Sequence, residues 1–396
     1  MRRNVGCKNA ETRIVRKITR NKKILRKGAK LFCIFLEIIF RIPYLVGKRM
    51  GMEDLTCNLL MPFSEAIEQN SNCYVTYNLF PKVAKDLNKW IPYKGRISEK
   101  NCIIIQGPIR YKDDFTLETV RYYGRIFPGV QVIVSTWENE SQTYIDKLKR
   151  EKNCVVVVSK YPDCSGAGNV NYQTISSLQG MKEALKLGKQ YALKTRSDTR
   201  VTAVGIMDIL YQMLRTYPLP VKGKNSQKER LILFNTWLFQ PYHDSDIFFY
   251  GTVKDMIQLF DKKLNRDRSI ENAANKMVGN RWTYRDLYEH PYGENEILIK
   301  YFEKVNGSVA CDLGQWWSVL GERVIALPLN FLRPLWVKYD YNHEESNFFM
   351  TYRRKIMGGC GMDNTKVDFT MWLDMYNGEF KLNPRDYEYL LDRPMS

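Results

Sequence analysis

The stretch "NCIIIQGPI" (101–109) begins the part of the chain that decides the fold. It is a short β-branched run that ends in Gly-Pro, which is typical of a buried strand followed by a turn. "VQVIVSTW" (130–137), "CVVVVS" (154–159) and "YALKT" (191–195) repeat the pattern, and segments of helical length separate them. Short apolar strands that alternate with helices indicate an α/β fold with a mostly parallel central sheet and helices on both faces.

The spacing of apolar residues between and beyond these strands predicts the remaining elements. Helices are expected over 113–127, 140–150, 173–187, 205–215 and 291–304. Two further apolar runs, "RLILFNTWLF" (230–239) and "DIFFYG" (246–251), predict additional strands.

The chain has 396 residues, of which 44% are hydrophobic and 26% charged, so it can bury a large core. Its net charge of +18 is unevenly distributed: the first 50 residues hold fifteen Lys or Arg and two acids, and therefore carry +13 of it. Nine scattered cysteines, with no C-x-x-C and only three histidines, favour reduced thiols in a cytoplasmic compartment over a zinc site or a disulfide framework.

The basic N-terminal segment, residues 1–50, is predicted to be an amphipathic arm on an anionic membrane surface. Its most apolar window, "LFCIFLEIIF" (31–40), is too short to span a bilayer and contains Glu37. A disordered tail and a nucleic-acid arm are the alternatives. No aromatic–basic module follows in the body, so no nucleic-acid partner is expected. The expected location is cytoplasmic, peripheral on the inner face of the plasma membrane.

Polar residues follow each predicted strand. Because ligands bind outside the carboxyl ends of strands in open parallel sheets, these residues are the candidates for a site. They are Gln106-Gly107-Pro108, Ser135-Thr136-Trp137, Ser159-Lys160 and Arg196-Ser197-Asp198.

The most charged of these segments is "YALKTRSDTRV" (191–201). A carboxylate at a strand end, here Asp198, can hold a divalent metal that clamps a diphosphate, while Arg196 or Arg200 neutralises further phosphate charge. A structural Asp–Arg ion pair is the alternative, and the spacing does not separate the two.

A second acidic motif lies in "HDSDIFFYG" (243–251), where Asp244 and Asp246 have D-x-D spacing. Because the motif precedes its strand, its carboxylates are expected at the wrong edge of the sheet for a metal–diphosphate site. Asp246 would then orient an acceptor or cap the strand.

Glu294 opens the predicted helix of "PYGENEILIKYFEK" (291–304). An acid in this place is favoured by the helix dipole alone. The functional alternative is a general base that acts on an acceptor hydroxyl.

In order along the chain, these motifs resemble the WavE lipopolysaccharide-synthesis family, a bacterial group regarded as glycosyltransferases. The resemblance covers about residues 100–305. The resemblance rests on the motifs "IIIQGPI", "FPGVQVIVSTWE", "NVNYQTISSLQGMKEA", "YALKTRSDTRV", "DIFFYG" and "GENEILIKYF".

The resemblance implies a GT-A-like nucleotide-diphospho-sugar transferase fold. The matched part corresponds to a catalytic domain over 101–310. Outside it, the sequence predicts a connector over 51–100 packed on the body and an aromatic-rich C-terminal cap over 311–396, which is a candidate for the acceptor side. The donor-binding residues would be Gln106, Gly107, Pro108, Thr136, Asn171, Gln173, Lys194, Arg196 and Arg200. Asp198 would hold Mg²⁺ or Mn²⁺. The chain departs from D-x-D here, because Arg196 and Ser197 precede a single carboxylate.

The function expected from this resemblance is transfer of a sugar from a nucleotide-diphosphate donor to a lipopolysaccharide core, capsule or other lipid-linked or oligosaccharide acceptor. If the reaction inverts the anomeric carbon, Glu294 or Asp246 would be the catalytic base. The alternative is a non-catalytic sugar- or nucleotide-binding module of a glycan-synthesis complex, which the single carboxylate favours.

Overall fold

The structure is a computed structural model that describes residues 55–70, 80–87, 98–220, 227–266, 283–291, 293–337 and 365–394, with a few single positions before residue 98. The chain divides into two units, Met1–Leu79 and Phe80–Ser396. The first contains helix α2 (Leu55–Gln69). The predicted arm, apart from three single positions, and part of the predicted connector lie outside the described residues. In the part of the chain that is described, no helix has the length and apolar character needed to cross a membrane.

The second unit alternates strands and helices along most of its length. Its elements are β1 (Asn101–Gln106), α3 (Phe115–Ile126), β2 (Gln131–Trp137), α4 (Gln142–Lys149), β3 (Cys154–Ser159), α5 (Val170–Lys186), β4 (Tyr191–Arg196), β5 (Thr199–Val201), α6 (Ile206–Thr216), β6 (Leu231–Phe234), β7 (Phe249–Thr252), α7 (Val253–Phe260), α9 (Tyr284–Glu289), α10 (Glu294–Asn306), α11 (Leu313–Arg323), β8 (Val324–Leu327), β9 (Pro334–Trp336) and α13 (Phe369–Asn377).

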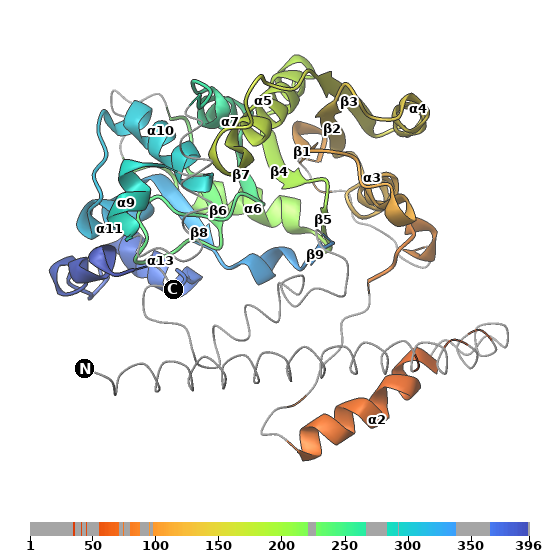
Figure 1. Ribbon diagram of the computed structural model, residues 1–396, viewed down its shortest axis with the longest axis horizontal. Coiled ribbons are helices and arrows are strands. Elements are labelled where there is room, and N and C mark those ends of the chain that lie inside the picture. The colour runs from red at the N-terminus through yellow and green to blue at the C-terminus, as the bar shows by residue number, and fades with distance from the viewer. Residues whose placement is uncertain are drawn as a thin grey trace, which may run out of the picture. The chain divides into compact units, whose positions relative to one another are not determined.

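Seven strands form the central sheet, in the order β3-β2-β1-β4-β7-β6-β8. Strand β1 pairs in parallel with β2 on one side and with β4 on the other, and Gln106 is the register partner of both Ser135 and Arg196. Strand β7 runs antiparallel to both of its neighbours, β4 and β6. The predicted α/β fold with a mostly parallel sheet is confirmed (Figure 1).

Helices cover both faces of the sheet, as predicted. The chain steps outward from β1 to β2 and β3, and then returns across β1 to β4. Because crossovers between parallel strands are right-handed, this reversal places α5 on the opposite face from α3 and α4 (Figure 1). Helix α5 packs on β1 and β2 and against α7. The carboxyl ends of β1 and β4 therefore meet at a topological switch point, where open α/β sheets bind their ligands.

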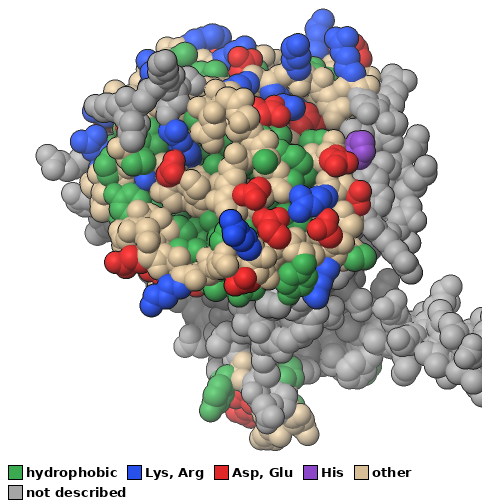
Figure 2. Space-filling model, turned by 90° about the vertical axis from the view of Figure 1, so that its left-hand side faces the viewer, with side chains coloured by type: hydrophobic (Ala, Val, Ile, Leu, Met, Phe, Trp, Pro, Cys, Tyr) green, Lys and Arg blue, Asp and Glu red, His purple; other side chains and the backbone are tan. Residues whose placement is uncertain are grey.

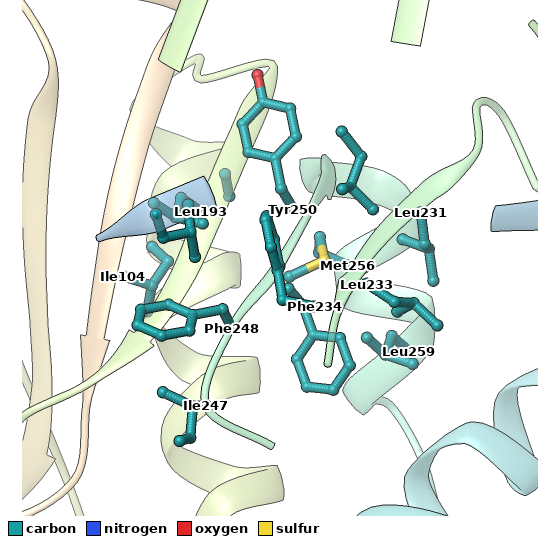
Figure 3. Packing of buried hydrophobic residues seen from close by; sticks show 14 of the residues in the cluster. Ile104, Leu193, Leu231, Leu233, Phe234, Ile247, Phe248, Tyr250, Met256 and Leu259 are labelled. Carbon is teal, nitrogen blue, oxygen red and sulfur yellow. The ribbon is translucent and has the colours of Figure 1, made fainter. Parts of the chain in front are cut away.

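Apolar side chains fix the sheet to the helix layer beneath the switch point. Figure 3 shows Ile104 of β1, Leu193 of β4 and Tyr250 of β7 among the residues that also come from β6 and α7. All three are fully buried, and each such side chain contributes about 1.5–3 kcal/mol. A Cβ atom on Gly180 of α5 would lie 2.5 Å from the side chain of Ile104, so only glycine allows this approach of helix and sheet.

The C-terminal part is rich in buried aromatic residues, as predicted, but it does not form a separate cap. Strand β8 extends the central sheet by pairing in parallel with β6. The Trp372 indole of α13 donates to the carbonyls of Leu320 and Val324, at 3.0 and 2.9 Å. The boundary predicted at 310 therefore falls inside one core. Strand β8 has only four residues and follows α11 directly, which leaves little periodic signal in the sequence.

The face that carries α9, α10 and α11 shows acidic and basic side chains interspersed (Figure 2). No large patch of one sign covers this view. This mixture agrees with the nearly balanced charge of the chain beyond residue 50.

Candidate active site

The end of β4 presents Lys194, Arg196 and Asp198 at the switch point. The turn at Ser197 is tied to β1, because the Ser197 amide donates to the Gln106 carbonyl at 2.9 Å. Beyond it, β5 pairs with β9, and the Val337 amide donates to the Asp198 carbonyl at 2.9 Å. The charged segment is thus held from both sides.

The Arg196 guanidinium is the centre of the site, because it joins two carboxylates. Its Nε and Nη2 atoms donate to the two oxygens of Asp198 at 3.0 and 2.9 Å, and its Nη1 atom donates to Asp246 Oδ2 at 2.9 Å. Burial would raise the pKa of Asp198, but the charge and hydrogen bonds of Arg196 hold it below the usual value. Burial would likewise lower the pKa of Arg196, and the two acids raise it.

Asp246 reaches this edge because β7 is antiparallel. The start of β7 lies beside the end of β4, where Phe249 is the register partner of Lys194. The Asp246 carbonyl accepts hydrogen bonds from Lys194 Nζ and, at 3.2 Å, from Gln173 Nε2. The expectation that Asp246 lies at the wrong edge was wrong, because it assumed that its strand is parallel.

Lys194 is completely buried beneath these groups. Its Nζ atom lies 5.6 Å from the centre of the Phe249 ring. Burial lowers the pKa of Lys194 to about 8; the nearby charge of Asp246 acts in the opposite direction, and Arg196 lowers the pKa further.

Glu294 is the first residue of α10 and adds a third acid to the cluster. It follows Gly293, whose φ of 56° and ψ of −118° suit glycine and whose amide donates to the Ala167 carbonyl at 3.3 Å. Burial and then the charge of Asp246 raise the pKa of Glu294 to about 7, against the opposing charges of Arg196 and Lys194. At neutral pH this carboxyl can therefore both accept and release a proton.

The other carboxylate of the D-x-D pair, Asp244, faces a different environment. It is fully buried, its Oδ1 atom accepts from the Thr236 hydroxyl at 2.7 Å, and its Oδ2 atom has no hydrogen-bond partner. Burial raises the pKa of Asp244 well above its usual value. The two acids of the motif do not converge on one metal.

The residues predicted after β1 and β2 lie at the same edge. The Gln106 side chain accepts from Ser176 at 2.8 Å, and Thr136 donates to Glu140 at 3.1 Å. Gly107 has φ of +111°, and a Cβ there would lie 3.1 Å from Ser197 Oγ. Pro108, which follows, is exposed.

Two of the predicted donor-binding residues, Asn171 and Arg200, make structural hydrogen bonds to backbone carbonyls away from Arg196. The Asn171 amide nitrogen donates to the carbonyls of Cys164 and Asn265, at 3.0 and 2.6 Å. The Arg200 guanidinium, 1% exposed, lies 4.9 Å from the centre of the Phe115 ring and donates to the Pro81 carbonyl at 2.7 Å. Neither is brought together with Arg196.

Arg110 and Glu140 also belong to the site, although the sequence motifs did not predict them. Arg110 Nη2 lies 3.7 Å from Asp198 Oδ2, and its side chain is 40% exposed. Glu140 accepts from the Ile109 amide at 2.8 Å and from the Tyr111 hydroxyl, so it fixes the loop that carries Arg110. The signal for Arg110 was present in "GPIR" (107–110), a basic residue directly after the first turn.

The residues present do not fit the Mg²⁺ or Mn²⁺ site expected at Asp198. Both oxygens of this carboxylate accept from Arg196, and Arg110 approaches one of them. Across the described part of the chain there is no group of three or more His, Cys, Asp or Glu residues that could hold a metal ion.

Comparisons with known proteins give one family match. A family model described as WavE lipopolysaccharide synthesis matches residues 102–306, just over half of the chain. A comparison with curated proteins finds no match. Among solved structures, a cytidylyltransferase from Leptospira borgpetersenii is 15% identical with a TM-score of 0.28, covering 45% of this chain and 73% of its own. A nucleotide-diphospho-sugar transferase, so described, from Desulfovibrio desulfuricans is 10% identical with a TM-score of 0.27, covering 46% and 76%. Similarities of this size carry no argument about this chain.

Proposed function

The chain belongs to the WavE lipopolysaccharide synthesis family, and on that premise we propose that it is a glycosyltransferase of the GT-A type. It transfers a sugar from a nucleotide-diphosphate donor to a hydroxyl group of a lipopolysaccharide core, capsule or related surface-glycan acceptor. The observation that carries the proposal is the charged cluster at the switch point of β1 and β4, where Glu294 has a pKa of about 7 beside Arg196.

Glu294 is the general base of this proposal. Its pKa near the working pH suits proton transfer, whereas the Asp246 carboxylate is bound to Arg196 at 2.9 Å. The acceptor oxygen attacks the anomeric carbon and forms the new C–O bond, and its proton passes to the Glu294 carboxylate. The bond from the anomeric carbon to the phosphate oxygen breaks, and its electron pair leaves with the nucleoside diphosphate. The configuration at the anomeric carbon is inverted.

The donor lies along the ends of β1 and β4 in this proposal. Gln106, Gly107 and Pro108 approach the nucleotide, and the cations at the end of β4 face the diphosphate. Oriented charges that need no rearrangement during the reaction are the main source of transition-state stabilisation in such sites. Lys194 and Gln173 position Asp246 through its carbonyl, and so maintain the geometry around Arg196.

The test is release of nucleoside diphosphate from a panel of UDP-, GDP- and dTDP-sugars by the full chain, with CMP-sugars as the monophosphate comparison. We expect Glu294→Gln to lower turnover at least about 100-fold with donor binding retained. Glu303→Gln is the matched control: it lies in the same helix, but its side chain is 39% exposed and paired with Lys300.

Two outcomes would contradict the proposal. If the wild-type chain binds a nucleotide-sugar but neither transfers nor hydrolyses it, the chain is a binding module. If Glu294→Gln and Glu303→Gln turn over equally, Glu294 is not the base.

A further inference from the structure

We propose that Arg110 neutralises the donor's diphosphate in place of a divalent metal, beside two carboxylates that Arg196 already binds. This inference rests on the proposed function, because it concerns the same donor site. It begins from the disagreement between the GT-A expectation of a metal at Asp198 and the bonds that Asp198 makes.

Arg196 occupies the position between the two carboxylates that converge at the switch point. It makes three hydrogen bonds of 2.9–3.0 Å, two to Asp198 and one to Asp246. Charge-assisted, bidentate bonds of this kind are among the stronger polar interactions in proteins. A metal ion at Asp198 would have to compete with two of these bonds, and a metal ion at Asp246 Oδ2 would have to compete with the third. Either ion would also place a second cationic centre beside buried Lys194.

Arg110 is the cation that remains able to bind an anion. Its contact with Asp198 is long, at 3.7 Å, and its Nε atom has no hydrogen-bond partner. Its backbone, by contrast, is fixed: the Arg110 amide donates to Thr116 Oγ1 at 2.9 Å, and the Arg110 carbonyl accepts from the Thr116 amide at 3.2 Å. The protein therefore holds the base of the side chain in place and leaves its guanidinium available.

The two arginines have different tasks. Arg196 binds both carboxylates and so occupies the ligands that a metal would need. Arg110, 40% exposed, can turn its planar guanidinium from Asp198 to two phosphate oxygens, which a guanidinium binds bidentately. The Asp198 carboxylate keeps its bonds to Arg196 when Arg110 leaves, so no buried charge is left unpaired.

The test measures binding of UDP, GDP, CDP and dTDP to the full chain by calorimetry, in EDTA and in Mn²⁺ or Mg²⁺. We expect the Kd of the preferred nucleotide to change less than about twofold between EDTA and metal. We expect Arg110→Gln to raise this Kd about 10-fold or more in EDTA, since the substitution removes charge-assisted hydrogen bonds to the phosphate oxygens.

Arg121→Gln is the matched control. Its side chain is 42% exposed, and it pairs with Glu118 and Glu151, the second of which lies before β3 and so toward the opposite edge of the sheet. Thermal melts confirm that each variant folds. Binding that disappears in EDTA and returns with Mn²⁺ would overturn the inference and leave the proposed function standing. Wild-type affinity of Arg110→Gln would also overturn it. If no nucleotide binds under any condition, the proposed function fails and the inference fails with it.

Discussion

Replacing Glu294 by glutamine should stabilise the folded protein above neutral pH while it removes activity. The pKa of Glu294 is raised from 4.5 to about 7, first by burial and then by the charge of Asp246. A carboxyl with a raised pKa favours folding below its unfolded-state pKa, and this contribution is lost as the pH rises through the folded-state pKa. The wild-type protein therefore loses stability between about pH 4.5 and 7, and glutamine does not titrate.

The size of the effect follows from the shift. At about 1.4 kcal/mol per pH unit, a change from 4.5 to about 7 corresponds to roughly 3 kcal/mol for a group fully removed from water. The side chain of Glu294 is partly exposed, which reduces this figure. We expect Glu294→Gln to be about 2 kcal/mol more stable than wild type at pH 8, and to differ much less at pH 5.

Urea unfolding at pH 5 and pH 8 measures this difference. The matched control Glu303→Gln, in the last turn of α10, should stay within about 0.5 kcal/mol of wild type at both values. A Glu294→Gln variant that is less stable than wild type at pH 8, or that differs from it equally at both pH values, would refute the assignment of a raised pKa to this carboxyl.

Four further predictions concern other residues of the chain. Asp246→Asn should move the acidic limb of the pH–rate profile to lower pH, by less than the full shift, because burial of Glu294 remains; an unmoved limb contradicts the coupling. Arg200→Gln should lower the unfolding free energy by about 2–4 kcal/mol and leave the nucleotide Kd unchanged, because Arg200 is buried against Phe115. Asp244→Asn should cost less stability at pH 7 than Asp244→Ala, since burial raises the pKa of the acid and the neutral amide still accepts from the Thr236 hydroxyl; equal losses would argue against this. Deletion of residues 1–50 should abolish flotation with anionic liposomes, and retained flotation would assign membrane binding elsewhere.

The strands around the switch point were predictable because they are continuous apolar runs. Strands β1, β2, β3 and β4 begin and end within about three residues of the predicted bounds. The run "RLILFNTWLF" (230–239) was misleading: β6 ends at Phe234, because Asn235 takes a positive φ of 77° and the following residues pair with the C-terminal segment at Lys366. Strands β5, β8 and β9 have three or four residues each, too few for a periodic signal.

The antiparallel direction of β7 was not predicted from the motifs, and this is why Asp246 was expected at the wrong edge of the sheet. Parallel neighbours need a long crossover, usually a helix, but no helix is present between Phe234 and Phe249 in the structure. The short connection "NTWLFQPYHDSD" (235–246), which has no helical spacing, was therefore a sequence signal for an antiparallel pair. The sequence "GPIR" (107–110) places Arg110 directly after the first turn, but its contact with Asp198 depends on tertiary packing between two loops, which no local pattern predicts.

Charge matching explains why Glu294, rather than its neighbours, has the pKa of a general base. Lys194 and Arg196 lie two residues apart on β4, so their side chains project from the same face of the sheet. Arg196 joins the carboxylates of Asp198 and Asp246, and Lys194 binds the Asp246 carbonyl. These two cations are matched by two acids. Glu294, from α10, is a third acid, and none of these cations forms a hydrogen bond with it. A proton on Glu294 makes the charges of the site equal, and this favours its protonated form. A one-residue slip of β4 against β1 and β7 would turn Lys194 and Arg196 to the opposite face, so the register of the sheet sets the proton affinity of this carboxyl.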